Sequence, residues 1–177
     1  MPSLDLPHDD ATPTPALTFR ELLDYTAAET ARWHRWLADG RGELLDLPAG
    51  EGRTATVRGL LQHVFAVERR YADRLLGEPV TPYEAIDTRD VATLFAAGAE
   101  ARQRLERYLA GATAADLARR LEFQTLSAGT QSASARKIVA HALVHGIRHW
   151  AQLATVVRQH GEATDWMHDL LVSDALA

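Results

Sequence analysis

The sequence contains no cysteine, no long apolar run and no excess of positive charge. Without cysteine the chain cannot form a disulfide, use a thiolate as a nucleophile or hold zinc through sulfur. Any metal ion must therefore be held by histidine, aspartate, glutamate or water. No segment approaches the ~18 consecutive apolar residues that a membrane-spanning helix needs, so we expect no membrane partner.

The charge balance is acidic, with a formal net charge of −5 at pH 7. Binding to nucleic acid needs clustered positive charge, and the basic pairs Arg69-Arg70 and Arg119-Arg120 are interrupted by acids. We interpret them as solvated helix faces and expect no nucleic-acid partner. The first residues, MPSLDLPHDDATPTP, show no basic start followed by an apolar block. We therefore expect a cytoplasmic protein.

Length and local composition predict one domain behind a flexible N-terminal segment. A chain of 177 residues can bury a single substantial core. We expect the flexible segment over residues 1–16 and the domain over residues 17–177, because four prolines near the N-terminus deny a helix there. These are Pro2, Pro7, Pro13 and Pro15.

Four segments carry apolar residues at helical spacing, and a glycine ends or follows each of them. At the start of the first segment Thr18 is a predicted N-cap, with Glu21 at the spacing of a capping box. Four amphipathic helices without a βαβ pattern predict an all-α four-helix bundle. The predicted helices cover about residues 19–39, 56–77, 88–109 and 134–160.

Two further segments differ from the helices. In RLEFQTLSAGTQS, residues 120–132, apolar and polar residues alternate before a Ser-Ala-Gly-Thr turn signal. We predict a short extended or hairpin excursion there, between the third and fourth helices. The last residues, 164–177, are predicted to pack Trp166 and Leu170 against the bundle.

His145 and His149 are the strongest candidate metal ligands, because a separation of four places two imidazoles on one face of a helix, one turn apart. A helical wheel turns both toward the interior, whereas His141 falls on the polar side beside Arg148. His141 and His149 are about 12 Å apart along the axis, and metal–nitrogen bonds are only about 2.0–2.1 Å. The pair His145 and His149 is therefore favoured, with His141 and His145 as the alternative.

A catalytic metal site usually has a third protein ligand beside an open position. His34, His63 and His168 are the histidines of the predicted domain that lie outside the fourth helix. His63 lies next to the apolar stripe of its helix and is preferred over His34, although spacing alone does not decide between them. An inward histidine can instead be a hydrogen-bonded core residue that binds no metal.

Glu68 stands in the middle of the apolar stripe of residues 56–77, where an ionised carboxylate needs a partner. It lies about 140° around the helix from His63, so we do not expect both to reach the same ion. We interpret Glu68 as one half of an ion pair with an arginine of a neighbouring helix, in preference to a catalytic base.

The segments LLQHVFAVERRYADRLLG and HALVHGIRHWAQL, with a DW-type tail, resemble the DinB/YfiT-like family of metal-binding four-helix bundles. The similarity covers about Phe19 to Leu171. Family members show a histidine and then a glutamate on the second helix, and H-x-x-x-H followed shortly by glutamine on the fourth. Those positions here are His63, Glu68, His145, His149 and Gln152.

The resemblance implies that His63, His145 and His149 hold one divalent metal ion, with water in the open position. Gln152 becomes a candidate for orienting His149 or a ligand, while catalytic and cofactor-binding residues are not assigned. The chain departs from the family pattern at Trp150 and Ala151, where arginine and glycine are common. Imidazole suits several metals; we expect zinc or nickel, with iron or manganese as alternatives.

Relatives in this superfamily include transferases and isomerases that use low-molecular-weight thiols. The resemblance therefore implies an S-transferase, or a related hydrolase, that acts on a small-molecule substrate. A non-catalytic metal-binding or stress-associated protein is the alternative. We also expect a homodimer, and a metal affinity that falls below about pH 6.5 because imidazole must be neutral to bind.

Overall fold

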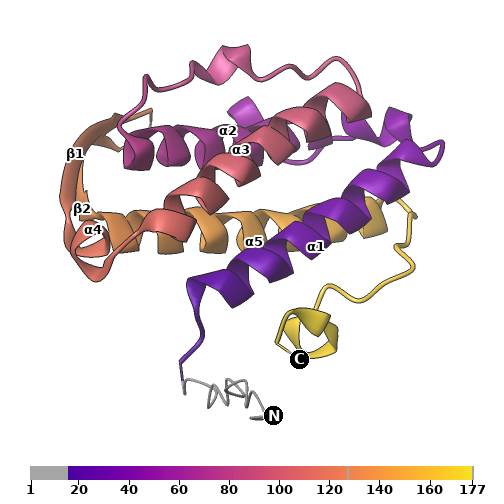
Figure 1. Ribbon diagram of the computed structural model, residues 1–177. Coiled ribbons are helices and arrows are strands. Elements are labelled where there is room, and N and C mark those ends of the chain that lie inside the picture. The colour runs from indigo at the N-terminus through magenta and orange to yellow at the C-terminus, as the bar shows by residue number, and fades with distance from the viewer. Residues whose placement is uncertain (1–15, 127, 177) are drawn as a thin grey trace, which may run out of the picture.

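A computed structural model describes residues 16–126 and 128–176 (Figure 1). The fold is an all-α bundle with one small hairpin, as predicted. Of the predicted flexible segment, only Ala16 lies within the described residues. The main helices are α1 (Phe19–Ala38), α2 (Val57–Leu76), α3 (Val91–Gly111) and α5 (Ala135–Gln159); the short helix α4 (Ala114–Ala118) and the strands β1 (Arg120–Thr125) and β2 (Gly129–Ser134) lie between α3 and α5.

The helix boundaries follow from local capping. The predicted capping box is present, since the Thr18 hydroxyl accepts from the Glu21 N–H and the Glu21 carboxylate accepts from the Thr18 N–H. Helix α3 begins at Val91 and not near residue 88, because the Asp90 side chain accepts from the Thr93 N–H and so caps the helix.

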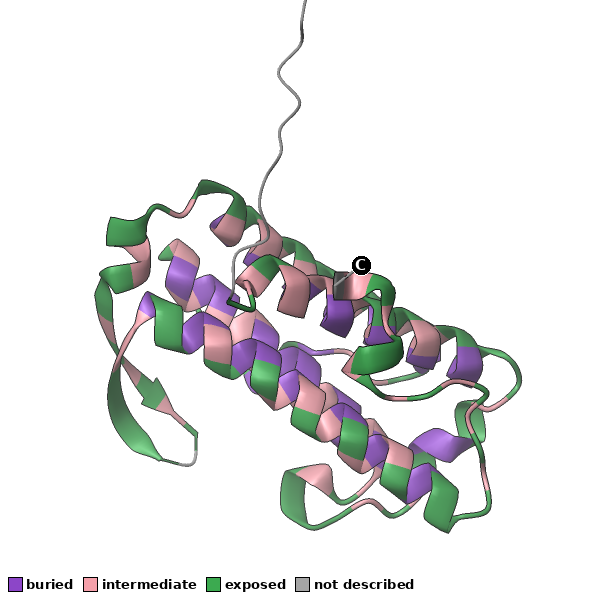
Figure 2. Ribbon diagram, turned by 90° about the horizontal axis from the view of Figure 1, so that it is seen from below, coloured by how far each residue is buried: buried purple, intermediate pink, exposed green. Residues whose placement is uncertain are grey.

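Helix α2 lies between its two partners α3 and α5, and α1 packs on α5 and α3. Buried residues gather where the helices face one another, and the outer faces are exposed (Figure 2). The antiparallel hairpin β1–β2 lies at one end of the bundle and is largely exposed. None of the described helices is long and apolar enough to cross a membrane.

The C-terminal segment docks on α1 through Trp166, as the sequence predicted for that residue. The Trp166 ring meets Trp33 edge to face at 5.1 Å, and its Nε1 donates to the buried Glu29 carboxylate at 3.2 Å. The His168 imidazole also contacts Glu29, which removes His168 from the candidate metal ligands. Leu170 is only half-buried, so Trp166 is the main apolar anchor of this segment.

Glu68 pairs with an arginine of the neighbouring helix, and the interpretation of this residue as an ion-pair partner is confirmed. Arg102 of α3 approaches both carboxylate oxygens, with Nε at 3.0 Å from Oε1 and Nη2 at 3.1 Å from Oε2. Arg102 also donates to the Thr26 hydroxyl on α1 at 2.6 Å. One partly buried guanidinium therefore links α1, α2 and α3.

Candidate metal centre

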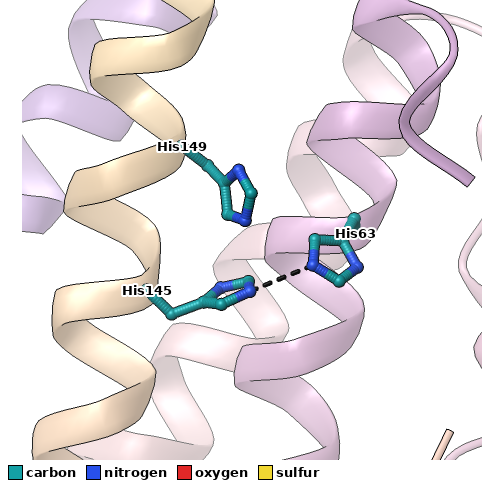
Figure 3. A group of neighbouring side chains, drawn as sticks. All are labelled: His63, His145 and His149. Carbon is teal, nitrogen blue, oxygen red and sulfur yellow. Dashed lines mark hydrogen bonds between the residues drawn. The ribbon is translucent and has the colours of Figure 1, made fainter. Parts of the chain in front are cut away.

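Three histidines from two helices converge on one point between α2 and α5 (Figure 3). His63 comes from α2, and His145 and His149 come from α5. The Nε2 atoms of His63 and His145 are 3.0 Å apart. One ring nitrogen from each of the three histidines lies within 4.8 Å of the others. The structure thus brings together the three residues that the resemblance implied.

The donor geometry fits a single metal ion. With metal–nitrogen bonds of about 2.0–2.1 Å, two ligand nitrogens on one ion are separated by about 3.0–3.4 Å. The separation of His63 and His145 is already in this range, and a small rotation of His149 would complete the set. In the metal-free chain the same 3.0 Å separation also suits an N–H···N hydrogen bond between these two rings.

Gln152 holds His149 through its second ring nitrogen. The Gln152 amide nitrogen donates to the Ala49 carbonyl at 3.3 Å, which leaves Oε1 to accept from His149 Nδ1 at 2.9 Å. With the proton on Nδ1, Nε2 of His149 keeps the lone pair that a metal ion needs. The predicted contact between Gln152 and the histidine cluster is therefore present.

The environment keeps all three imidazoles neutral near pH 7. Burial and, to a smaller extent, the neighbouring His149 lower the pKa of His63 to about 4 and that of His145 to about 3. Burial also lowers the pKa of His149, although its hydrogen bond with Gln152 opposes the shift. Neutral imidazole is the form that coordinates a metal ion.

We expect metal affinity to survive mild acid, which revises the sequence-based expectation of a fall below about pH 6.5. Three ordinary imidazoles would lose affinity about 10⁴-fold between about pH 7 and pH 5, because each must shed a proton. With His63 and His145 still neutral at pH 5, the loss should be at most about 30-fold, and the steep fall should begin near the pKa of His63, about 4. Zinc competition titrations against a chromophoric chelator at each pH would measure this; a 10⁴-fold loss by pH 5 contradicts it.

The Gln152→Leu variant should bind zinc about 10–100-fold more weakly, because His149 loses the acceptor that fixes its tautomer and ring orientation. Gln152→Glu retains an acceptor at the same place and should bind close to wild type. Gln103→Leu, on the exposed face of α3, is the matched control. The same chelator titration distinguishes these outcomes, and equal affinity in Gln152→Leu and Gln103→Leu would remove the assigned role.

The other candidate histidines lie elsewhere. His141 is exposed and its ring lies against Tyr71 at 5.3 Å, outside the three-histidine group. His34 stacks on Phe95 at 4.8 Å. The helical wheel was therefore right to place His141 on the outer side of α5.

The two positions that depart from the family pattern do not alter the donors. Trp150 is buried and stacks on Trp33 at 6.4 Å, so it is a core residue. Ala151 lies on the exposed side of α5.

A cavity of about 470 Å³ opens beside His63 and His145, and we call it the α2–α5 cavity. Periodicity could have identified its α2 wall, because the residues there share one helix face. It could not have found the contributions of the loops and hairpin, which have no periodic pattern. The lining residues are His63, Val67, Arg70, Tyr71 and Arg74 of α2, His141 and His145 of α5, Thr125 and Leu126 of the hairpin, and Glu51, Arg53, Thr54 and Tyr83.

The model of the DinB family matches residues 12–175, nearly the whole chain. No curated protein matches the chain.

Proposed function

Because the chain belongs to the DinB family, we propose that it binds one divalent metal ion through His63, His145 and His149 and transfers a low-molecular-weight thiol to a small electrophile. Zinc or nickel is the proposed metal, since imidazole donors suit both. Related hydrolysis of a small molecule is the close variant of the same proposal.

The observation that carries the proposal is a group of three neutral imidazoles that opens on a cavity. A divalent ion bound by three uncharged ligands would lower the pKa of a thiol or water molecule placed beside it. Side chains of the bundle orient the metal ligands. Gln152 fixes the ring of His149, while His63 and His145 line the cavity in which a small molecule fits.

The cavity also favours an enzyme over a protein that only holds metal. A metal-holding protein gains nothing from space beside its ion, whereas a catalyst needs room for its substrate. A thiol is favoured over water as the nucleophile because its ordinary pKa, about 8.5, is already close to neutral pH. A thiol therefore needs less help from neighbouring side chains than water does to lose its proton and become a nucleophile.

The test is a turnover assay with protein purified without a metal-affinity resin. After elemental analysis, the zinc- and nickel-loaded forms are mixed with chlorodinitrobenzene and, in turn, cysteine, glutathione and coenzyme A, and the thioether product is followed. Metal-dependent product that is lost in His145→Ala supports the proposal. If neither loaded form turns over any of these thiols, the thiol-transfer proposal is wrong.

A further inference from the structure

Three arginine side chains line the α2–α5 cavity together with the histidines: Arg53, Arg70 and Arg74. Within residues 16–126 and 128–176, none of the three has a carboxylate within ion-pair distance. Their neighbour Arg69, on another face of α2, pairs with both Asp73 and Glu100. The arginines that face the cavity therefore form no ion pair with a described carboxylate, and Glu51 is the one acidic residue among the lining residues.

The order of residues along the helices makes the cavity long, with different chemistry at its two ends. Arg70 and Arg74 follow His63 by seven and eleven residues, about 10 and 16 Å along the α2 axis. On α5, His145 meets His63, and His141 meets Tyr71 further along α2. One end of the cavity thus holds the histidines, and the other holds Arg74 beside the hairpin.

The two α2 guanidinium groups are held in place and keep spare donors. Arg70 Nη1 donates to the Thr81 carbonyl at 2.7 Å, and Arg74 donates to the Arg70 and Gln124 carbonyls at 3.0 and 2.8 Å. A guanidinium has five N–H donors, so most of them remain for a ligand. Burial and the charge of Arg70 both lower the pKa of Arg74, which is the effect of placing two cations close together away from water.

Tyr83 gives a second, independent sign of a missing ligand. Its side chain lines the cavity and is only 7% exposed, yet its hydroxyl has no hydrogen-bond partner among the described residues. Buried hydroxyl groups normally have a partner. Its ring lies 6.5 Å from that of His63 and under the Arg53 guanidinium, so this donor belongs to the histidine end.

We propose that the α2–α5 cavity binds an elongated, anionic small molecule whose carboxylate or phosphate group lies against Arg70 and Arg74 while its other end reaches His63, His145 and Tyr83. Planar guanidinium groups match both kinds of acid group through paired hydrogen bonds. The volume, about 470 Å³, suits a small molecule and not a polymer. The reactive end rests on the proposed function; the acid-binding end rests on the arginines alone.

The experiment measures anion binding to metal-free protein by titration calorimetry, so that no ion competes for the probe. The probes are succinate, inorganic phosphate and the uncharged succinamide. We expect at least one anion to bind, succinamide not to bind, and affinity to fall about tenfold or more in Arg70→Gln and in Arg74→Gln. Arg158→Gln, which removes the same charge at the far end of α5, should bind as wild type.

The comparison of succinate with phosphate identifies the acid group. The wild-type contrast between succinate and succinamide needs no variant, so it stands even if Arg74→Gln loosens the hairpin. Failure of both anions to bind wild type, or equal binding by wild type and both arginine variants, overturns the proposal.

The same proteins separate this inference from the proposed function. Arg70→Gln and Arg74→Gln should retain their full metal content, and His145→Ala should still bind the anion. A chain that binds the anion but no metal would contradict the proposed function and leave the acid-binding end intact. A chain that binds metal but no anion would contradict the acid-binding end and leave the proposed metal site intact.

Discussion

The His145→Ala variant is expected to lose nearly all of the divalent metal that the wild-type chain carries. His145 presents Nε2 at 3.0 Å from that of His63, and its ring centroid is 4.8 Å from that of His63 and 4.4 Å from that of His149. Without it only two imidazoles remain, fewer than the three protein ligands of a typical open site. Metal content, measured after gel filtration, should fall from about one ion per chain to about a tenth of that or less.

His141→Ala is the matched control, since His141 lies one turn earlier on the same helix and is exposed. It should retain the wild-type metal content. A second readout is thermal stability: zinc at about 1,000 times its dissociation constant should stabilise wild type by about 4 kcal/mol and His145→Ala hardly at all. Equal metal content in wild type and His145→Ala would falsify the site, and loss only in His141→Ala would point to another group of donors.

The Arg102→Met variant is expected to lower the free energy of unfolding by about 3–5 kcal/mol, because it leaves the Glu68 carboxylate buried without its cation. Glu68 is only 5% exposed. For a chain of this length the melting temperature should fall by about 6–20 °C. Calorimetry or denaturant unfolding would measure both values.

The loss should grow as the pH rises. Burial raises the pKa of Glu68, and Arg102 opposes that rise in the wild-type chain. Without Arg102 the folded state holds a proton that the unfolded state releases above its ordinary pKa, so stability falls with increasing pH. Arg102→Met should therefore be less destabilised at pH 5 than at pH 8.

Two control variants test whether the unpaired charge of Glu68 causes the loss of stability in Arg102→Met. Glu68→Leu/Arg102→Met removes both charges and should recover most of the lost stability, as exchange of a whole buried pair for apolar residues usually does. Arg20→Met breaks the exposed pair with Asp24 and should change stability by less than about 1 kcal/mol. If Arg102→Met is no more destabilised than Arg20→Met, removing the partner of Glu68 does not cost the expected free energy of unfolding.

Helical spacing alone identified two of the three histidines, His145 and His149. The spacing of His145 and His149 and their direction on a helical wheel depend only on α5 itself, and both were right. His63 is different, because which residue of α2 meets α5 depends on how the two helices rotate and pack. The resemblance to the DinB family supplied that residue, where spacing left it open beside His34.

The sequence analysis also missed helix α4, two residues of the cavity wall and the lowered pKa values of the histidines, each for a physical reason. Helix α4 has only five residues, too few for a periodic pattern, although Thr113 and Asp116 form a capping box that marks its start. Tyr83 and Arg53 reach the cavity from single 3-10 turns, Tyr83–Ala85 and Gly52–Thr54, which are too short for a periodic pattern. The lowered pKa values of the histidines also needed the structure, because burial is their largest cause.

One contact that holds the hairpin to the bundle is made through the hairpin backbone. Arg74 donates to the backbone carbonyl of Gln124, and every residue type offers that acceptor. The side chain of Leu126 can therefore be exchanged without loss of this anchor, although it forms part of the cavity wall. Thr125 is more constrained, because its hydroxyl donates to the Gly129 carbonyl and accepts from the Ala128 N–H. A different side chain at position 126 would thus change the shape of the cavity while the histidines on α2 and α5 stay as they are.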